Sequence, residues 1–289
     1  MYAQDTIIWP DFSQTSARSN LLRELKRINS KTFWVEMLPL FQHDYLTLPK
    51  DHYKLWASNL IIPFETFRNQ DVVSINDSTW PAIFEGSNLY KEALWQYPIG
   101  IPLDHLTNFF TPYYDFLTTR TRACALSHLI SANITPEQIQ QMEVIVEIGA
   151  GTGDMADIVH KLGFKGKYII FDFAEVSLMQ KWYHDQLGLK NITYVTDPAE
   201  LEPADLTIAA WSFTEMGLEL RNEIVKAIGT NGEWMIAYSD SIFEIDNADY
   251  LTSTFAPLFS NRHCLIQFFD ASYVTGDGGT RYLVIKNTK

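Results

Sequence analysis

The chain has 289 residues, which is the length of one large domain or of two ordinary ones. Its composition is 46% hydrophobic and 20% charged with 14 glycines and 12 prolines, which excludes collagen-like and disordered chains. The formal charge of −13 disfavours nucleic acid as a partner, because binding to a polyanion depends on clustered Lys and Arg.

The two cysteines, Cys124 and Cys264, lie far apart and have no metal-like spacing, so we expect neither a disulfide framework nor a metal site. The first residues lack a basic segment followed by an apolar one, and no stretch reaches the ~18 apolar residues of a membrane span. We therefore expect a cytoplasmic protein without a membrane partner. Its oligomeric state is left open.

Residues 1–142 have a helical and aromatic pattern. Residues 16–30 place leucines and an isoleucine on one helical stripe. Aromatic residues are dense from Trp80 to Tyr114, where prolines interrupt any long helix. Residues 116–132 predict another helix, and Thr135-Pro-Glu is typical of a helix start. We expect a mainly helical cap that contributes to the acceptor site.

Two arginines lie two positions apart in the predicted helix 116–132. Because residues at this spacing do not share a helix face, Arg120 and Arg122 are expected on different sides. One of them could meet a phosphate of an activated sugar, but we expect exposure to solvent.

Residues 143–289 alternate between strand and helix patterns, which predicts a Rossmann-like, doubly wound α/β sheet of seven strands. The last two strands are joined without a helix, so they must pair antiparallel. The predicted strands cover 144–148, 168–171, 192–195, 206–210, 233–238, 264–269 and 282–285, and the predicted helices 154–162, 176–187 and 218–228; a further segment, 247–259, lies between the fifth and sixth strands.

The most informative motif is Glu147-Ile-Gly-Ala-Gly-Thr-Gly-Asp154, between the first strand and its helix. Three alternate glycines let the backbone turn tightly and approach a ligand closely. The start of the following helix presents unpaired N–H groups and the positive end of its dipole. The motif therefore favours an anionic group, either a phosphate or a carboxylate.

The spacing of the glycines separates these two ligands. A nicotinamide site of the form G-x-G-x-x-G would place a glycine where this chain has Asp154, whose carboxylate would face the pyrophosphate. Asp172 follows the second strand, at the sheet edge where a carboxylate can hold both hydroxyls of a ribose. The pattern indicates a ligand with a carboxylate and a ribose.

The run Glu147–Gly153 resembles the first motif of class I S-adenosylmethionine-dependent methyltransferases, and the resemblance covers about residues 143–287. It implies that the glycine loop holds the methionine end, Asp172 the ribose and Asp197 the adenine amine. The cofactor-binding residues it implies are Glu147, Gly149, Ala150, Gly151, Thr152, Gly153, Asp172, Phe173, Asp197, Trp211 and Ser212.

Residues 170–176, 180–184 and 211–216 are similar to a bacterial group of sugar O-methyltransferases. That group more often carries a second glycine and a tyrosine in the loop, where this chain has Ala150 and Thr152. The resemblance implies a sugar or nucleotide-linked sugar as the acceptor, and this departure concerns the acceptor rather than the cofactor.

Methyl transfer to a hydroxyl needs a base within hydrogen-bond reach of the acceptor. Glu215 and Asp240 follow the fourth and fifth strands at the cofactor edge and are the candidates, although Glu215 could instead cap a helix. Glu147 could cap the loop, and Asp197 could be a turn former before Pro198. His184 is expected to be structural.

The resulting hypothesis is an enzyme that transfers a methyl group from S-adenosylmethionine to a hydroxyl of a small polar acceptor. Three alternatives stay open at this point. An N-methyltransferase would use the same cofactor but need no base, a nicotinamide oxidoreductase would bind NAD, and a non-catalytic module would bind the cofactor without turnover.

Overall fold

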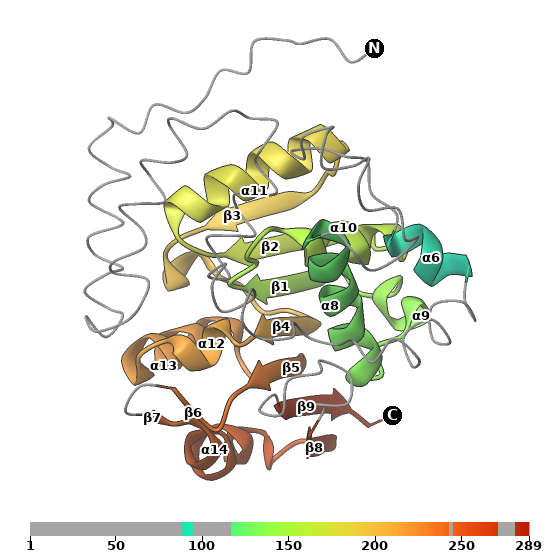
Figure 1. The fold of residues 1–289 in the computed structure, drawn as a ribbon. Coiled ribbons are helices and arrows are strands. Elements are labelled where there is room, and N and C mark those ends of the chain that lie inside the picture. Colours follow the sequence, from blue (N-terminus) through green and yellow to red (C-terminus); the bar gives the residue numbers. More distant parts are fainter. Residues whose placement is uncertain (1–87, 95–116, 243–244, 271–280, 289) are drawn as a thin grey trace, which may run out of the picture.

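The structure is a computed structural model that describes residues 88–94, 117–242, 245–270 and 281–288 (Figure 1). The helix expected over 16–30, most of the aromatic segment and the connection 271–280 lie outside the described residues. The division into a cap and a cofactor domain at residue 142 therefore stays a prediction.

A seven-stranded sheet forms the centre of the fold, in the order β3-β2-β1-β4-β5-β9-β8. All seven predicted strands are confirmed; the five inner strands are largely buried, whereas the two edge strands are mostly half-buried or exposed. The strands are β1 (Val144–Ile148), β2 (Lys167–Phe171), β3 (Ile192–Val195), β4 (Leu206–Ala210), β5 (Glu233–Tyr238), β8 (Cys264–Asp270) and β9 (Arg281–Asn287).

Strands β1 to β5 are parallel, whereas β9 runs antiparallel to both of its neighbours, as predicted. Ile285 of β9 pairs with Trp234 of β5 on one side and with Ile266 of β8 on the other. The last strand is thus an inner strand of the sheet, and β8 forms its edge.

Helices cover both faces of the sheet (Figure 1). One face packs against α6, α8, α9 and α10, and the other against α13 and the helical segment 250–259. The helices are α6 (Asn88–Leu94), α8 (Leu117–Ser131), α9 (Pro136–Ile139), α10 (Asp154–Lys161), α11 (Ala174–Leu187), α12 (Ser212–Glu215), α13 (Leu218–Ile228) and α14 (Asn247–Asp249).

Short elements complete the chain. A 3-10 turn covers Pro198–Glu200, and the segment 247–259 is built from α14, a π-helical turn (Tyr250–Phe255) and a 3-10 turn (Ala256–Phe259). The small hairpin of β6 (Ser241–Ile242) and β7 (Ile245–Asp246) was not predicted. Within the described residues, no helix has the length and apolar character needed to cross a membrane.

Candidate functional site

The carboxyl edge of the sheet has a topological switch point between β1 and β4, where the strand order reverses. Ligands of open α/β sheets bind in the crevice at such a point. The glycine loop follows β1 here, Asp172 follows β2, and Trp211 and Ser212 follow β4. The fold therefore brings most of the predicted cofactor residues to one edge.

The glycine loop has a backbone that only glycine adopts readily. Gly149, Gly151 and Gly153 have φ angles of +70°, +54° and +83°. A Cβ atom at Gly149 would lie 2.3 Å from Cβ of Ser212, and one at Gly153 would lie 2.5 Å from Nε2 of His184. The loop is thus held closely between the turn after β4 and helix α11.

Asp172 folds its carboxylate back onto the glycine loop. It accepts hydrogen bonds from the backbone N–H of Ala150 (3.1 Å) and Phe173 (2.8 Å) and from the side-chain amide of Gln180 (2.7 Å). Burial raises the pKa of Asp172 to about 6, although these hydrogen bonds favour the ionised form. The predicted ribose acid and the glycine loop are therefore in direct contact.

Glu147 is a buried acid and the penultimate residue of β1, just before the loop. It accepts a hydrogen bond from the hydroxyl of Tyr168 at 2.8 Å. Burial raises the pKa of Glu147 to about 8, and the charges of Asp172 and Asp154 raise it further. At neutral pH this side chain is largely protonated, so it can donate as well as accept a hydrogen bond.

The expectation that Arg122 is exposed to solvent is wrong, because its side chain is fully buried. Its guanidinium pairs with Asp157 and lies 3.7 Å from the Asp154 carboxylate on α10. Asp154 also accepts a hydrogen bond from the hydroxyl of Thr152. A buried charge network therefore anchors the end of the glycine loop, and the side chain of Asp154 faces Arg122.

The turn after β4 starts at Trp211, which has a φ of +64°. Its N–H donates to the Ala237 carbonyl at 2.8 Å, and its indole meets the His128 ring edge-on with centroids 5.0 Å apart. The Ser212 hydroxyl donates to the carbonyl of Ile148 at the end of β1. The two turns of the switch point are thus joined directly.

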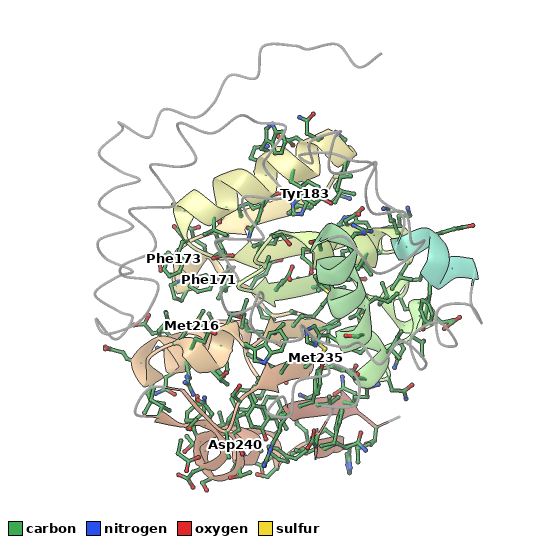
Figure 2. All side chains as sticks on the ribbon, viewed as in Figure 1. Phe171, Phe173, Tyr183, Met216, Met235 and Asp240 are labelled. Atoms are coloured by element: carbon green, nitrogen blue, oxygen red, sulfur yellow. The ribbon has the colours of Figure 1, made fainter. Side chains whose placement is uncertain are left out.

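The two predicted bases differ in their surroundings. Glu215 is the half-buried last residue of α12, one turn after Trp211. The Asp240 carboxylate pairs with Arg281 at 2.8 Å, and both side chains are about half exposed at 49% and 48%. Figure 2 shows Asp240 on the β5 side of the edge and Phe173 on the β2 side.

Asp197 has the turn-forming role that its position before Pro198 suggested. It is the N-cap of the 3-10 turn Pro198–Glu200 and accepts a hydrogen bond from the N–H of Ala199 at 3.0 Å. Asp197 follows β3, two strands from the switch point. Its expected contact with adenine stays a prediction.

Sequence reasoning missed Gln180 as a site residue. Its amide donates to the Gly151 carbonyl at 3.0 Å as well as to Asp172, and the Nε2 atom of His184 donates to the Gly153 carbonyl at 2.8 Å. Both side chains are buried on α11. The sequence feature that could have indicated them is a pair of polar residues four positions apart, which therefore share one face of the helix after Asp172.

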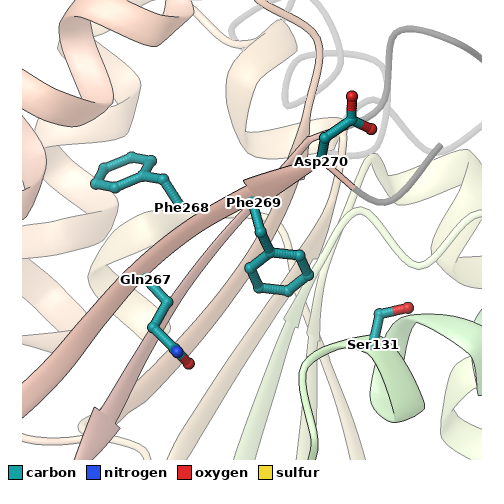
Figure 3. Close-up of a pocket in the computed structure, with 5 residues that line it drawn as sticks. All are labelled: Ser131, Gln267, Phe268, Phe269 and Asp270. Atoms are coloured by element: carbon teal, nitrogen blue, oxygen red, sulfur yellow. The ribbon is translucent and has the colours of Figure 1, made fainter. Parts of the chain in front are cut away.

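A separate shallow pocket lies beside the edge strand β8 and is lined by Ser131, Gln267, Phe268, Phe269 and Asp270 (Figure 3). The rings of Phe268 and Phe269 point to opposite sides of the strand, and Phe269 stacks on Tyr282. This pocket includes no residue of the glycine loop. Among the described residues, no cluster of His, Cys, Asp and Glu is arranged to hold a metal ion.

No family model matches the sequence, and no curated protein matches it. An rRNA methylase from Streptococcus thermophilus is 14% identical, with 55% of this chain and 95% of that chain covered and a TM-score of 0.42. A SAM-dependent methyltransferase from Aquifex aeolicus is 16% identical, with coverages of 58% and 98% and a TM-score of 0.39. The [4+2]-cyclase SpnF is 12% identical, with coverages of 62% and 84% and a TM-score of 0.45.

Proposed function

We propose that the protein binds S-adenosylmethionine and transfers its methyl group to a hydroxyl of a small polar acceptor, a sugar or a nucleotide-linked sugar. The observation that carries the proposal is the contact between the glycine loop and Asp172 at the switch point, with an Ala150 N–H to carboxylate distance of 3.1 Å. One ligand with a carboxylate and a ribose can reach both.

The charges around the loop support this cofactor over a dinucleotide. Glu147, Asp154 and Asp172 surround the loop, and only Asp154 lies close to Arg122. Because Glu147 is largely protonated at neutral pH, the charges that a pyrophosphate would meet unfavourably are those of Asp154 and Asp172, whereas S-adenosylmethionine carries an ammonium and a sulfonium beside its carboxylate. The loop N–H groups would hold the carboxylate, and Glu147 would face the amino-acid end.

A buried polar atom also fits such a ligand. The Oε1 atom of Gln180 is buried and accepts no hydrogen bond from the described residues. Buried oxygens of this kind are rare in folded proteins, and a hydroxyl or ammonium of a ligand would satisfy this one. Asp172 would hold the ribose, Asp197 the adenine, and Phe173, Trp211 and Ser212 would line the remainder of the site.

The chain's own contribution to the reaction is to orient the acceptor and remove its proton. When bound, the cofactor supplies a methyl group on a positively charged sulfur, which accepts the electron pair of the broken bond. Glu215 is the better-placed base, because it is half-buried in the short helix that follows β4 at the switch point, whereas the Asp240 side chain is half exposed. Glu215 would take the hydroxyl proton as the oxygen forms its bond to the methyl carbon.

Calorimetry on the full chain tests the cofactor. We expect uptake of S-adenosylmethionine and S-adenosylhomocysteine and none of NAD. A chain that binds NAD, or that binds neither methyl compound, would overturn the proposal.

Mass spectrometry of sugars and nucleotide sugars incubated with the chain and the methyl donor tests the acceptor. A product heavier by one methyl group is expected. Glu215→Gln should lower its rate by about 10²–10⁴-fold, the usual contribution of a general base, and Asp240→Asn should lower it less. Equal rates for Glu215→Gln and the unmodified chain would exclude Glu215 as the base.

A further inference from the structure

Gln180 joins two parts of the cofactor site that are far apart in the sequence. One hydrogen of its amide group points to the Gly151 carbonyl at 3.0 Å and the other to the Oδ2 atom of Asp172 at 2.7 Å. The side chain is fully buried, so water does not compete for these bonds. The loop and the acid after β2 are therefore fixed to one another through a single side chain.

A primary amide is well suited to join the Gly151 carbonyl to the Asp172 carboxylate. Two acceptors must be bridged, a carbonyl and a carboxylate, and a primary amide supplies two hydrogens without adding a charge. A lysine would bring a charge, and a carboxylic acid would have one proton at most. His184, one helical turn later, donates to the Gly153 carbonyl, so α11 holds two carbonyls of the loop that are two residues apart.

The orientation of these carbonyls decides which way the loop N–H groups point. Because a peptide plane carries its C=O and the next N–H in opposite directions, fixing the Gly151 carbonyl toward α11 turns the N–H of Thr152 away from it. Fixing the Asp172 carboxylate likewise decides which of its lone pairs a ligand can reach. Its backbone partners Ala150 and Phe173 leave it little remaining capacity.

We propose that Gln180 is a positioning residue of the cofactor site, which aligns the glycine loop and keeps Asp172 oriented and ionised for a ribose. This inference rests on the proposed function. Gln180 itself need not contact the reacting atoms, although its Oε1 atom would accept from a ligand donor.

The charge state of Asp172 gives this role a measurable signature. The groups facing it are the amide of Gln180 on α11, the backbone N–H groups of Ala150, Gly151 and Phe173, and the buried acid Glu147 on β1. Burial raises the pKa of Asp172 to about 6, and the hydrogen bond from Gln180 lowers it. Losing that hydrogen bond therefore raises the pKa further, and cofactor affinity should be lost at a higher pH.

The experiment is calorimetric titration of the full chain with S-adenosylhomocysteine from pH 5 to pH 8.5. Gln180→Met keeps the length of the side chain and removes both hydrogens. We expect binding at pH 7 to weaken by about 10–100-fold, the loss typical of a hydrogen bond to a charged group. The pH at which affinity is half lost should rise by about one unit.

Gln186→Met is the matched control, because Gln186 is exposed on the same helix. It should leave both affinity and pH midpoint unchanged. A merely structural role for Gln180 predicts a less stable chain whose pH midpoint stays where it was, and that result would overturn the proposal, as would an affinity within twofold of the unmodified chain.

If the methionine variant does not fold, Gln180→Glu provides a second test of the positioning role. The introduced carboxyl has one hydrogen to donate, and only while it is protonated, so it can hold one of the two acceptors at low pH and repels Asp172 once it ionises; affinity should therefore fall as pH rises from 6 to 8, opposite to the unmodified chain. A parallel pH profile would contradict the proposal. If the unmodified chain binds neither methyl compound, the proposed function and this inference both fail, whereas normal binding with unchanged variants removes this inference alone.

Discussion

The two turns at the switch point both use positive φ angles, but with very different residues. The turn after β1 uses three glycines at φ +54° to +83°, where they meet no steric penalty. The turn after β4 places Trp211, one of the largest side chains, at φ +64°. A bulky residue in this region is strained by about 1–3 kcal/mol, and such strain gathers at functional sites.

Different interactions hold the two turns. The carbonyl of Trp211 accepts from the N–H and hydroxyl of Thr214 at 2.9 and 2.8 Å, so hydrogen bonds and the His128 contact hold the strained residue. The glycine loop is held by side chains that reach it from α10 and α11. The glycine turn lets a ligand approach the backbone closely, whereas the turn after β4 carries an indole ring that packs on His128.

The largest effect should come from removing the charge that anchors the glycine loop. Arg122→Met removes the buried guanidinium from Asp154 and leaves Asp157 with only the partly exposed Lys161 ammonium at 3.0 Å, so we expect a loss of about 3 kcal/mol in the free energy of unfolding. Urea denaturation measures it. Lys181→Met, which removes an exposed ion pair with Asp185, is the control and should change little. Equal losses of stability in the two variants would show that the buried charge network does not anchor the glycine loop.

Gly149→Ala tests the junction between the turns. The new Cβ atom would clash with Ser212 in a backbone of φ +70°, so we expect a loss of about 2–4 kcal/mol and of cofactor binding. Gly188→Ala has nearly the same φ, +69°, with nothing near its Cβ, and should lose only about 1 kcal/mol. Similar losses in thermal unfolding would mean that Ser212 moves aside.

Glu147→Gln tests the buried acid before the loop. Below pH 4.5 its carboxyl is protonated in both the folded and unfolded chain, but between pH 4.5 and about 8 only the folded chain keeps the proton. The stabilising contribution is therefore lost as pH rises through this window. From pH 5 to pH 8 the unmodified chain should lose on the order of 2 kcal/mol more than the variant in urea denaturation. Glutamine resembles the protonated carboxyl, so the neighbouring acids keep similar surroundings in the variant. Parallel slopes of stability against pH in the two chains would contradict the assignment.

The smallest effect concerns the strain at Trp211. Both Trp211→Ala and Trp211→Gly lose the indole contact with His128, but only alanine keeps the strained φ. The glycine variant should therefore be the more stable of the two, by about 1 kcal/mol, which reverses the usual order of these residues. A more stable alanine variant in thermal unfolding would show that the turn relaxes.

Much of the fold could be predicted because its signals are local. Each strand is a short apolar run, and helix α13 ends at Gly229, which has a φ of +78°, as its sequence indicates. The antiparallel last strand followed from a connection without a helix. The pieces α12, β6 and β7 are too short to produce a periodic pattern, so they were missed.

The site was less predictable where it depends on distant partners. Arg122 is buried only because α8 packs against α10, which places Asp157 beside it across 35 positions of sequence. No local pattern reports such a pairing. Gln180 was overlooked for the same reason, since its role depends on the loop carbonyl that α11 meets in three dimensions.

The inner position of β9 has a consequence for how the chain is made. Leu283 and Ile285 are fully buried between β5 and β8, so the sheet is incomplete until residues 281–287 have left the ribosome. Until then the growing polypeptide carries β5 with an open side, including Trp234 and Ile236. Nascent chains with such unpaired edges are prone to associate, so this protein should need shielding by chaperones during translation.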